Sequence, residues 1–171
     1  MAMISRTSEY ALRAVVHLAS AANSDKPSQT VGEITLGTHV PGGYLAKVLQ
    51  SLSRAGIITS QRGAGGGFRL TKAARETSLY EVIQAVDPMQ RIHDCPLGLE
   101  AHGTNLCPLH RRLDDAMSLI EEQFRAITIS ELLEEPDARK ISAARGTPCT
   151  FPLTAVARTL STASSRGPNG K

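Results

Sequence analysis

Apolar residues recur every three or four positions in four stretches of the chain, the spacing of one buried face of an α-helix. These stretches cover about residues 5–21, 41–56, 78–87 and 108–127. Their apolar positions are Leu12, Val15, Val16 and Ala19; Leu45, Val48, Leu49 and Leu52; Leu79, Val82, Ile83 and Val86; and Leu109, Leu113, Ala116, Met117, Ile120, Phe124 and Ile127. The pattern predicts a mainly α-helical protein.

A further short helix is expected directly before the second stretch. Thr30 and Glu33 have the spacing of a capping box, in which each side chain bonds to the other residue's backbone amide. This helix should stop near Gly37, and the next should begin at Pro41, which has no amide to leave unpaired. Gly56 suits the left-handed position that follows a helix. Two helices joined by a tight turn predict a helix-turn-helix.

Two β-prone runs, Ile57–Thr59 and Phe68–Leu70, flank a glycine-rich segment at 63–67. A glycine-tipped hairpin after two helices predicts a winged helix-turn-helix. The glycines do not form a nucleotide-binding motif. A dinucleotide fingerprint needs a glycine where Phe68 stands, and a P-loop needs Lys followed by Ser or Thr.

Positive charge is concentrated on this predicted unit. Residues 34–75 hold six basic side chains and no Asp or Glu, whereas the rest of the chain up to Glu135 holds seven basic and fifteen acidic ones. Such a local field favours a polyanion, and double-stranded DNA is the expected partner. A solvated basic face on an ordinary helical domain is the alternative. The candidate DNA-binding residues are Tyr44, Lys47, Gln50, Arg54, Arg62, Gly63 and Arg69, with Arg62 and Gly63 directed at the minor groove.

The fourth stretch predicts a long helix with one narrow apolar seam. About 20 residues at 1.5 Å each give roughly 30 Å, and such a helix is expected to pair with its copy in a second subunit. A homodimer would place one recognition helix on each half of a roughly palindromic site. Thr128 and Glu131 should cap a final short helix that reaches over the partner.

Cys95 and Cys107 are separated by eleven residues, and His110 follows on the first turn of the long helix. Thiolates and imidazole together suit iron–sulfur, zinc or copper(I) sites. From spacing alone, two ordinary thiols and a surface histidine remain the alternative. Three cysteines in a reducing compartment favour a metal or redox role over disulfides, and Cys149 is expected to be unrelated to this loop.

Several of these motifs resemble the IscR/NsrR-type family of bacterial transcription regulators. They are Tyr10-Ala11-Leu12-Arg13, Pro41-Gly42-Gly43-Tyr44-Leu45-Ala46-Lys47-Val48-Leu49, Arg62-Gly63-Ala64-Gly65-Gly66-Gly67-Phe68-Arg69-Leu70, and the pattern Cys95, Cys107, His110. The resemblance covers about Met1 to Glu135. It implies a homodimeric, sequence-specific DNA-binding protein, often with an iron–sulfur cluster as its sensor.

Cluster-bearing members of this family show Cys, five residues, Cys, five residues, Cys, two residues, His. Cys95, Cys107 and His110 match the first, third and fourth positions, but Ala101 stands at the second. A 2Fe–2S cluster is the first hypothesis for this site. The candidates for its fourth ligand are His102, His93 and Glu9. In some members of the family that this chain resembles, an acidic residue matching Glu9 is a ligand from the other subunit. A zinc site and a cofactor-free regulator are the alternatives.

These features together predict a winged helix-turn-helix domain at 1–88, a cofactor loop at 89–107, a dimerisation helix and short terminal helix at 108–135, and a disordered basic tail at 136–171. The expected function is transcriptional regulation, as a repressor that senses iron–sulfur, redox or nitric oxide status. No signal peptide or membrane span is expected, so the protein should be cytoplasmic. The acidic residues do not converge, which favours a non-enzymatic protein over a small metal-dependent redox enzyme.

Overall fold

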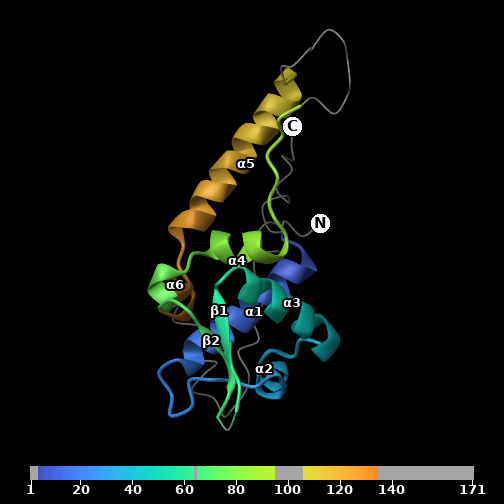
Figure 1. The fold of residues 1–171 in the computed structure, drawn as a ribbon. Coiled ribbons are helices and arrows are strands. Elements are labelled where there is room, and N and C mark those ends of the chain that lie inside the picture. Colours follow the sequence, from blue (N-terminus) through green and yellow to red (C-terminus); the bar gives the residue numbers. More distant parts are fainter. Residues whose placement is uncertain (1–3, 64, 95–105, 135–171) are drawn as a thin grey trace, which may run out of the picture.

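The structure is a computed structural model that describes residues 4–63, 65–94 and 106–134 (Figure 1). In chain order its elements are α1 (Arg6–Ala21), α2 (Val31–Thr38), α3 (Gly42–Arg54), β1 (Ile58–Gln61), β2 (Gly67–Leu70), the 3-10 turn η1 (Ala74–Glu76), α4 (Leu79–Val86), α5 (Pro108–Ala126) and α6 (Ile129–Glu134). The predicted fold class, a mainly α winged helix-turn-helix with a long C-terminal helix, is confirmed.

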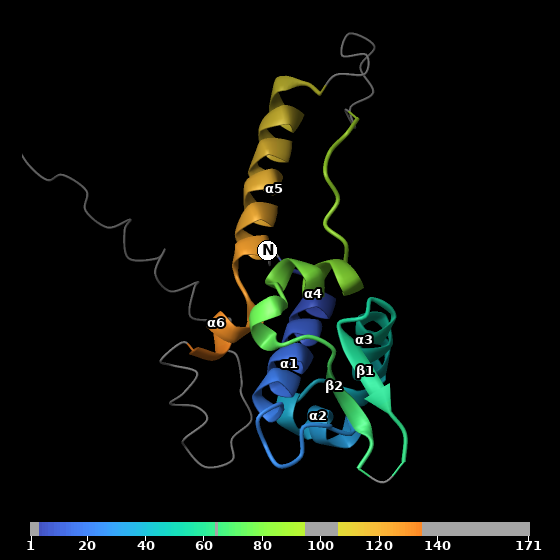
Figure 2. The ribbon, with the colours of Figure 1, turned by 60° about the vertical axis from the view of Figure 1, so that its left-hand side comes forward.

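We call α1–α4, β1, β2 and α6 together the head. Figures 1 and 2 show α5 extending away from the head on the side of α4, while the β1–β2 hairpin lies at the opposite end beside α2. No helix among the described residues is long and apolar enough to cross a membrane.

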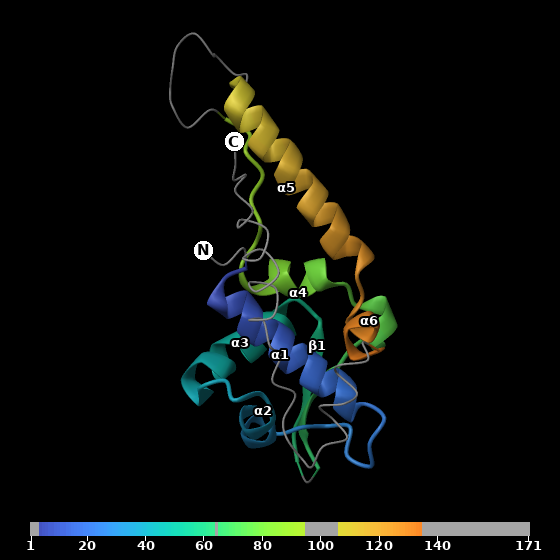
Figure 3. The same ribbon diagram turned by 180° about the vertical axis from the view of Figure 1, so that it is seen from behind.

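The core of the head is built around α1. The side chains of Ala11, Ala14, Val15 and Leu18 have no exposed area, and α2, α3, α4, α6 and β2 all pack against this helix. Seen from behind, α1 crosses the head diagonally below α4 (Figure 3). The small alanines let neighbouring helices approach closely, so α1 can be covered on several sides at once. The helix was expected to begin at about Ser5 or Thr7, and Ser5 is its N-cap, because the Ser5 hydroxyl accepts a hydrogen bond from the amide of Ser8 at 3.2 Å.

The helix-turn-helix forms with small changes from the predicted boundaries. The Thr30–Glu33 capping box is present, with the Thr30 amide donating to Glu33 Oε2 at 2.7 Å. Helix α2 ends at Thr38, and the residue with a left-handed backbone after it is His39, with a φ of 55°. Pro41 is the N-cap of α3 and lies just outside the helix.

Gly37 therefore lies inside α2, where its role is close packing. A Cβ at Gly37 would lie 2.2 Å from Cε1 and 2.5 Å from Nδ1 of His17 on α1. The His17 ring occupies the space that any larger residue would need.

The hairpin after α3 forms the predicted wing. Gly56 has the expected positive φ of 74°, and β1 and β2 pair antiparallel from Ile58 opposite Leu70 to Gln61 opposite Gly67. The wing is also tied to the segment before α2, because Gln29 and Phe68 exchange two backbone hydrogen bonds of 2.9 and 2.7 Å. This third partner of the hairpin was not predicted. It explains Gly67, where a Cβ would lie 2.6 Å from the backbone of Gln29.

The chain returns to the head after α5. The Leu79 amide donates to the Ile127 carbonyl, and the Ile129 amide donates to the Thr77 carbonyl, both at 2.9 Å. Ile129 is completely buried in the core around α1. The predicted Thr128–Glu131 cap is present. However, α6 packs on α1 of its own chain, contrary to the expectation that it reaches over a partner, because Ile129 fills part of that core.

The contact between Gly37 and His17 predicts a position-specific stability effect. Gly37→Ala should lower the free energy of unfolding by about 1–3 kcal/mol, because the added methyl group forces two helices apart. Gly32→Ala is the matched control in the same helix, since its Cβ would meet nothing closer than 3.9 Å. This change should leave the stability unchanged or raise it by about 0.5–1 kcal/mol. Urea unfolding measures both, and equal effects would contradict the packing role of Gly37.

His17 should also make the stability depend on pH. Burial lowers the pKa of His17 below 6.5, although Gln29 and Glu33 act in the opposite direction. The unfolded chain takes up this proton more readily, so the stability contribution is complete above pH 6.5 and is lost as the pH falls below it. Urea unfolding at about pH 7.5 and about pH 5.5 should show a smaller loss on acidification in His17→Gln than in the parent protein. His39→Asn, which removes an exposed histidine, should keep the full loss.

Candidate nucleic-acid interface

Helix α3 has a buried face and an open face. Leu45, Val48, Leu49 and Leu52 are buried, as their spacing predicted. The candidate DNA-binding residues Tyr44, Lys47, Gln50 and Arg54 are all exposed on the other side. The structure therefore brings these four candidates together on one exposed face of one helix.

The start of α3 carries few side chains. Pro41, Gly42 and Gly43 are exposed, no side chain caps the helix, and a Cβ at either glycine would meet nothing within 4 Å. Tyr44 and Lys47 are consequently the side chains in the first turns of α3 that can form hydrogen bonds with a bound molecule. The leading end of the helix can approach a surface closely, because no side chain projects from its glycines.

Tyr44 is held by a contact that the sequence did not predict. Its ring lies 6.0 Å from the ring of Tyr10 on α1, at an angle of 59°. Tyr10 is partly buried against the core, whereas Tyr44 is 61% exposed. A tilted ring pair of this kind is favourable, so Tyr10 limits the orientations of Tyr44.

The six basic residues of the 34–75 stretch divide into two groups. Lys72 Nζ lies 3.3 Å from Glu81, and Arg75 lies 3.7 Å from Glu76. Within the described part of the chain, no carboxylate pairs with Lys47, Arg54, Arg62 or Arg69, which are all exposed. The positive charge without a paired carboxylate thus belongs to α3 and the wing. The charge of Lys72, at the base of the wing, is balanced by Glu81. Sequence counting could not assign Lys72 to the paired group, since Glu81 lies nine residues away on another element.

The wing presents Arg62 and Gly63 at its tip. Both are exposed, and Gly63 has a φ of 100°, which favours glycine. Residue 64 lies outside the described residues. Figure 2 shows the tip at the end of the head farthest from α5, so α3 and the wing are free of the long helix.

Of the candidate metal ligands, Cys107 and His110 lie at the opposite end of the molecule from the wing. Cys107 is the N-cap of α5 and is buried, and its Sγ lies 3.1 Å from Nδ1 of His110 one turn later. Cys95, Ala101 and His102 lie outside the described residues. Among the residues that the structure does describe, no group of three or more His, Cys, Asp or Glu side chains could hold a metal ion.

The segment that leads toward Cys95 is fastened to α5 by a contact that sequence reasoning missed. Arg91 binds both carboxylate oxygens of Asp114, with Nε–Oδ1 at 2.7 Å and Nη2–Oδ2 at 2.6 Å. The Ile92 amide donates to the same carboxylate at 2.9 Å. The bond to Arg91, followed by that amide, lowers the pKa of Asp114 to about 2. Residues 91–94 consequently run alongside α5 toward its first turn (Figure 1).

The other candidate ligands are placed differently. Glu9 lies on the first turn of α1 and pairs with Arg13 on the next turn. Helix α1 is in the head, whereas Cys107 begins the projecting end of α5 (Figure 1). Within one chain the structure does not bring Glu9 to Cys107 and His110. His93 is exposed in the segment beside α5.

A recognition helix, a basic wing and a separate long helix define a winged helix-turn-helix transcription regulator. A family model for Rrf2, described as an iron-dependent transcriptional regulator, matches residues 4–135, and the chain belongs to this family. It is 37% identical over 86 residues to an rrf2-like HTH-type transcriptional regulator of Rhodobacter capsulatus. That alignment covers 50% of this chain and 57% of the relative, so the match spans little more than half of the relative's length.

Solved structures show the same fold. T. potens IscR aligns with a TM-score of 0.66 at 21% identity, covering 85% of this chain and 94% of that one. CymR (YrzC), the global cysteine regulator of B. subtilis, aligns with a TM-score of 0.62 at 20% identity, covering 77% and 96%. These likenesses establish the fold shared by the family.

The two groups of basic residues predict unequal effects on DNA affinity. Arg62→Ala should weaken binding by about 1–3 kcal/mol, because an arginine in a narrow groove contributes to shape recognition as well as charge. Lys72→Ala should have a much smaller effect, since Glu81 already offsets that charge. Fluorescence anisotropy over a salt series measures affinity and salt slope together. Equal losses with equal changes of slope would mean that the wing contributes charge alone.

Proposed function

We propose that this Rrf2-family protein is a homodimeric repressor that binds a roughly palindromic operator through α3 and the wing. The observation that carries the proposal is the exposed, unbalanced charge of Lys47, Arg54, Arg62 and Arg69 on those two elements. Phosphate contacts from such residues position a protein on DNA, and the side chains of α3 read the base edges. Tyr44, Lys47 and Gln50 have this second role, while Arg62 and Gly63 enter the minor groove and Arg54 and Arg69 contact the backbone.

Dimerisation through α5 is supported by apolar side chains that its own chain leaves exposed. Asp114 binds Arg91 of the same chain, and Met117, Ile120 and Phe124 are partly buried. Leu109, Leu113 and Leu119 remain 60%, 46% and 59% exposed. A helix that packed only on its own subunit would bury such leucines. The exposed leucines therefore suit burial against α5 of a second copy.

Two heads joined in this way match the geometry of duplex DNA. Dimeric helix-turn-helix proteins place their recognition helices in major grooves about 34–36 Å apart, one helical turn of DNA. The projecting α5 separates the dimer contact from α3, so the angle at which α5 leaves the head sets the spacing of the two α3 helices. We assign the DNA-binding unit to residues 1–88, the sensor loop to 89–107 and the dimerisation segment to 108–135.

We further propose that Cys95, Cys107 and His110 hold a 2Fe–2S cluster that reports iron–sulfur, redox or nitric oxide status. The residues that the structure describes fit such a group in part, because one thiol and one imidazole already meet at 3.1 Å. Glu9 of a second subunit or His102 would supply the fourth ligand. When bound, a cluster of this kind would accept or release an electron, so the charge of the site would change with the redox state. Zinc at the same donors, or no cofactor, are the alternatives.

The Arg91–Asp114 contact supports a route from this site to the operator. It holds the start of the 89–107 loop against α5, about two turns beyond Cys107. A change at the ligands would thus act on the helix that separates the two heads. The role of α5 in both dimerisation and sensing makes it the two-state element that such regulation needs.

The dimer proposal predicts that Leu113→Asp separates the subunits, because a carboxylate would be buried in an apolar seam. Sedimentation should show a monomer, and operator affinity should fall by about 10²–10⁴-fold as two linked half-site contacts become one. Leu113→Met, which keeps volume and apolarity, is the matched control and should remain dimeric. A parent protein that sediments as a monomer while bound to its operator would refute the proposal.

The sensor proposal predicts stoichiometric iron and sulfide, with visible absorption, in protein purified without oxygen. Cys95→Ala and Cys107→Ala should each lose both, whereas Cys149→Ala is the matched control and should keep them. Zinc alone, lost in the same two variants, would select the zinc alternative. A colourless, metal-free protein with full operator affinity would reject the sensor and leave the DNA-binding proposal standing.

A further inference from the structure

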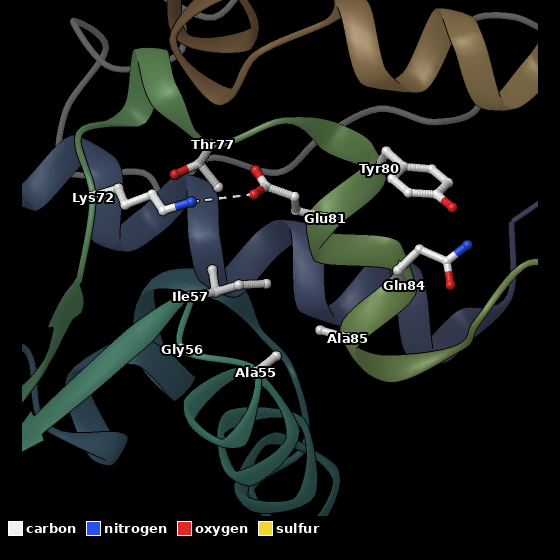
Figure 4. Close-up of a pocket in the computed structure, with 9 residues that line it drawn as sticks. All are labelled: Ala55, Gly56, Ile57, Lys72, Thr77, Tyr80, Glu81, Gln84 and Ala85. Carbon is white, nitrogen blue, oxygen red and sulfur yellow. Dashed lines mark hydrogen bonds and ion pairs between the residues drawn. The ribbon is translucent and has the colours of Figure 1, made fainter.

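A cavity of about 340 Å³ lies between the end of α3, the base of the wing and α4 (Figure 4). This volume is within the range of about 300–1,000 Å³ that is usual for small-molecule sites. The cavity is separate from the exposed face of α3 and from Cys107 and His110, so neither part of the proposed function uses it.

The upper rim of the cavity carries one positive and one negative side chain. Lys72 Nζ and Glu81 Oε1 are 3.3 Å apart, which is long for a charge-assisted hydrogen bond. The other carboxylate oxygen of Glu81 accepts the Ser78 amide at 2.9 Å. That bond, with Lys72 contributing less, lowers the pKa of Glu81 and keeps it ionised. Oε1 is left with only the long contact to Lys72 among the described bonds.

The floor of the cavity is apolar. Figure 4 shows Ile57, Ala55 and Ala85 facing the space below the Lys72–Glu81 pair, and Tyr80 lies on the same stretch of α4. Apolar walls with a few polar groups are typical of sites that bind a small organic molecule.

The charges on the rim select for the ionic form of the occupant. An anion would be attracted by Lys72 but repelled by Glu81. A cation would be attracted by Glu81 but repelled by Lys72. A zwitterion satisfies both side chains, because its ammonium can bind Glu81 Oε1 while its carboxylate binds Lys72 Nζ. Two short charge-assisted bonds would then replace one long one.

We propose that this cavity binds an aliphatic α-amino acid, with its charged groups on Lys72 and Glu81 and its side chain on Ile57 and Ala85. An α-amino acid places an ammonium and a carboxylate on adjacent carbons and projects an apolar group away from them, in the same arrangement as rim and floor. The site is independent of the proposed metal-responsive input.

An occupant of the cavity would touch the elements that position the DNA-binding surface. Gly56, with its positive φ of 74°, turns the chain from α3 into the wing, and Ile57 accepts the Thr71 amide at 3.0 Å across the base of the wing. The guanidinium carbon of Arg125, on α5, lies 3.9 Å from the centroid of the Tyr80 ring. The cavity therefore adjoins the recognition helix, the wing and the junction with α5. Amino-acid binding and operator binding should alter one another by the same factor.

The proposal is tested on the whole 171-residue chain without DNA, so the result does not depend on the proposed function. Calorimetric titration uses L-alanine, L-valine and L-leucine, with 4-methylpentanoate and 3-methylbutylamine as analogues of leucine that lack one charged group. At least one amino acid should bind with saturation, and each analogue should bind at least about tenfold more weakly, the loss of one charged contact. No binding by the three amino acids, or equal binding by the analogues, would overturn the proposal.

Two variants locate the binding, and a third serves as control. Lys72→Met removes the partner of the carboxylate, and Ala85→Phe fills the floor, so each should lose at least about tenfold in affinity. Arg75→Met removes a nearby exposed positive charge that does not line the cavity, and it should bind like the parent. Far-ultraviolet circular dichroism checks that each variant is folded. Unchanged affinity in folded Lys72→Met would overturn the assignment even if Ala85→Phe failed to fold.

Discussion

The burial of α1 is the constraint on which the rest of the head depends. Ala11, Ala14, Val15 and Leu18 have no exposed surface. Helices from both ends of the chain pack their apolar faces against α1. The apolar stripe of α3 must therefore point inward, which leaves Tyr44, Lys47, Gln50 and Arg54 on the open side. The face of α3 that packs into the core therefore determines which face is left exposed for contact with DNA.

Attachment of α5 to the head has a different physical character. After α5 the chain is anchored by Ile129 in the core and by backbone bonds to Thr77 and Leu79. By contrast, α5 itself is held by the ion pair of Asp114 with Arg91 and by the contact of Arg125 with the Tyr80 ring. Polar contacts can exchange partners at lower cost than a packed core, since most of their energy is regained from water. Changes in the direction of α5 are accordingly easier than changes within the head. In the proposed dimer, this asymmetry would keep each DNA-binding head rigid while allowing the separation between the two heads to change.

Much of the fold could be predicted from short-range patterns. Residues within one or two turns determine the capping box at Thr30, the apolar stripe of α3 and the left-handed backbone at Gly56. The exposed candidates on α3 could be listed for the same reason. Contacts between distant segments could not, because no local spacing encodes them. Gln29 with Phe68, and Arg91 with Asp114, are 39 and 23 residues apart. The pairing of Lys72 with Glu81 is likewise visible only in the folded chain. It removes Lys72 from the basic residues whose charge is left unpaired.

The central claim is that two heads, joined through α5, read two related half-sites with α3 and the wing. Selection of bound sequences from a random duplex library, with the mass of each protein–DNA complex measured on the enriched DNA, tests it most directly. The expected result is a sequence of approximate dyad symmetry, with half-site centres about one helical turn apart, bound by two copies of the chain. Enrichment of no sequence, or of an asymmetric site bound by a single copy, would contradict the claim.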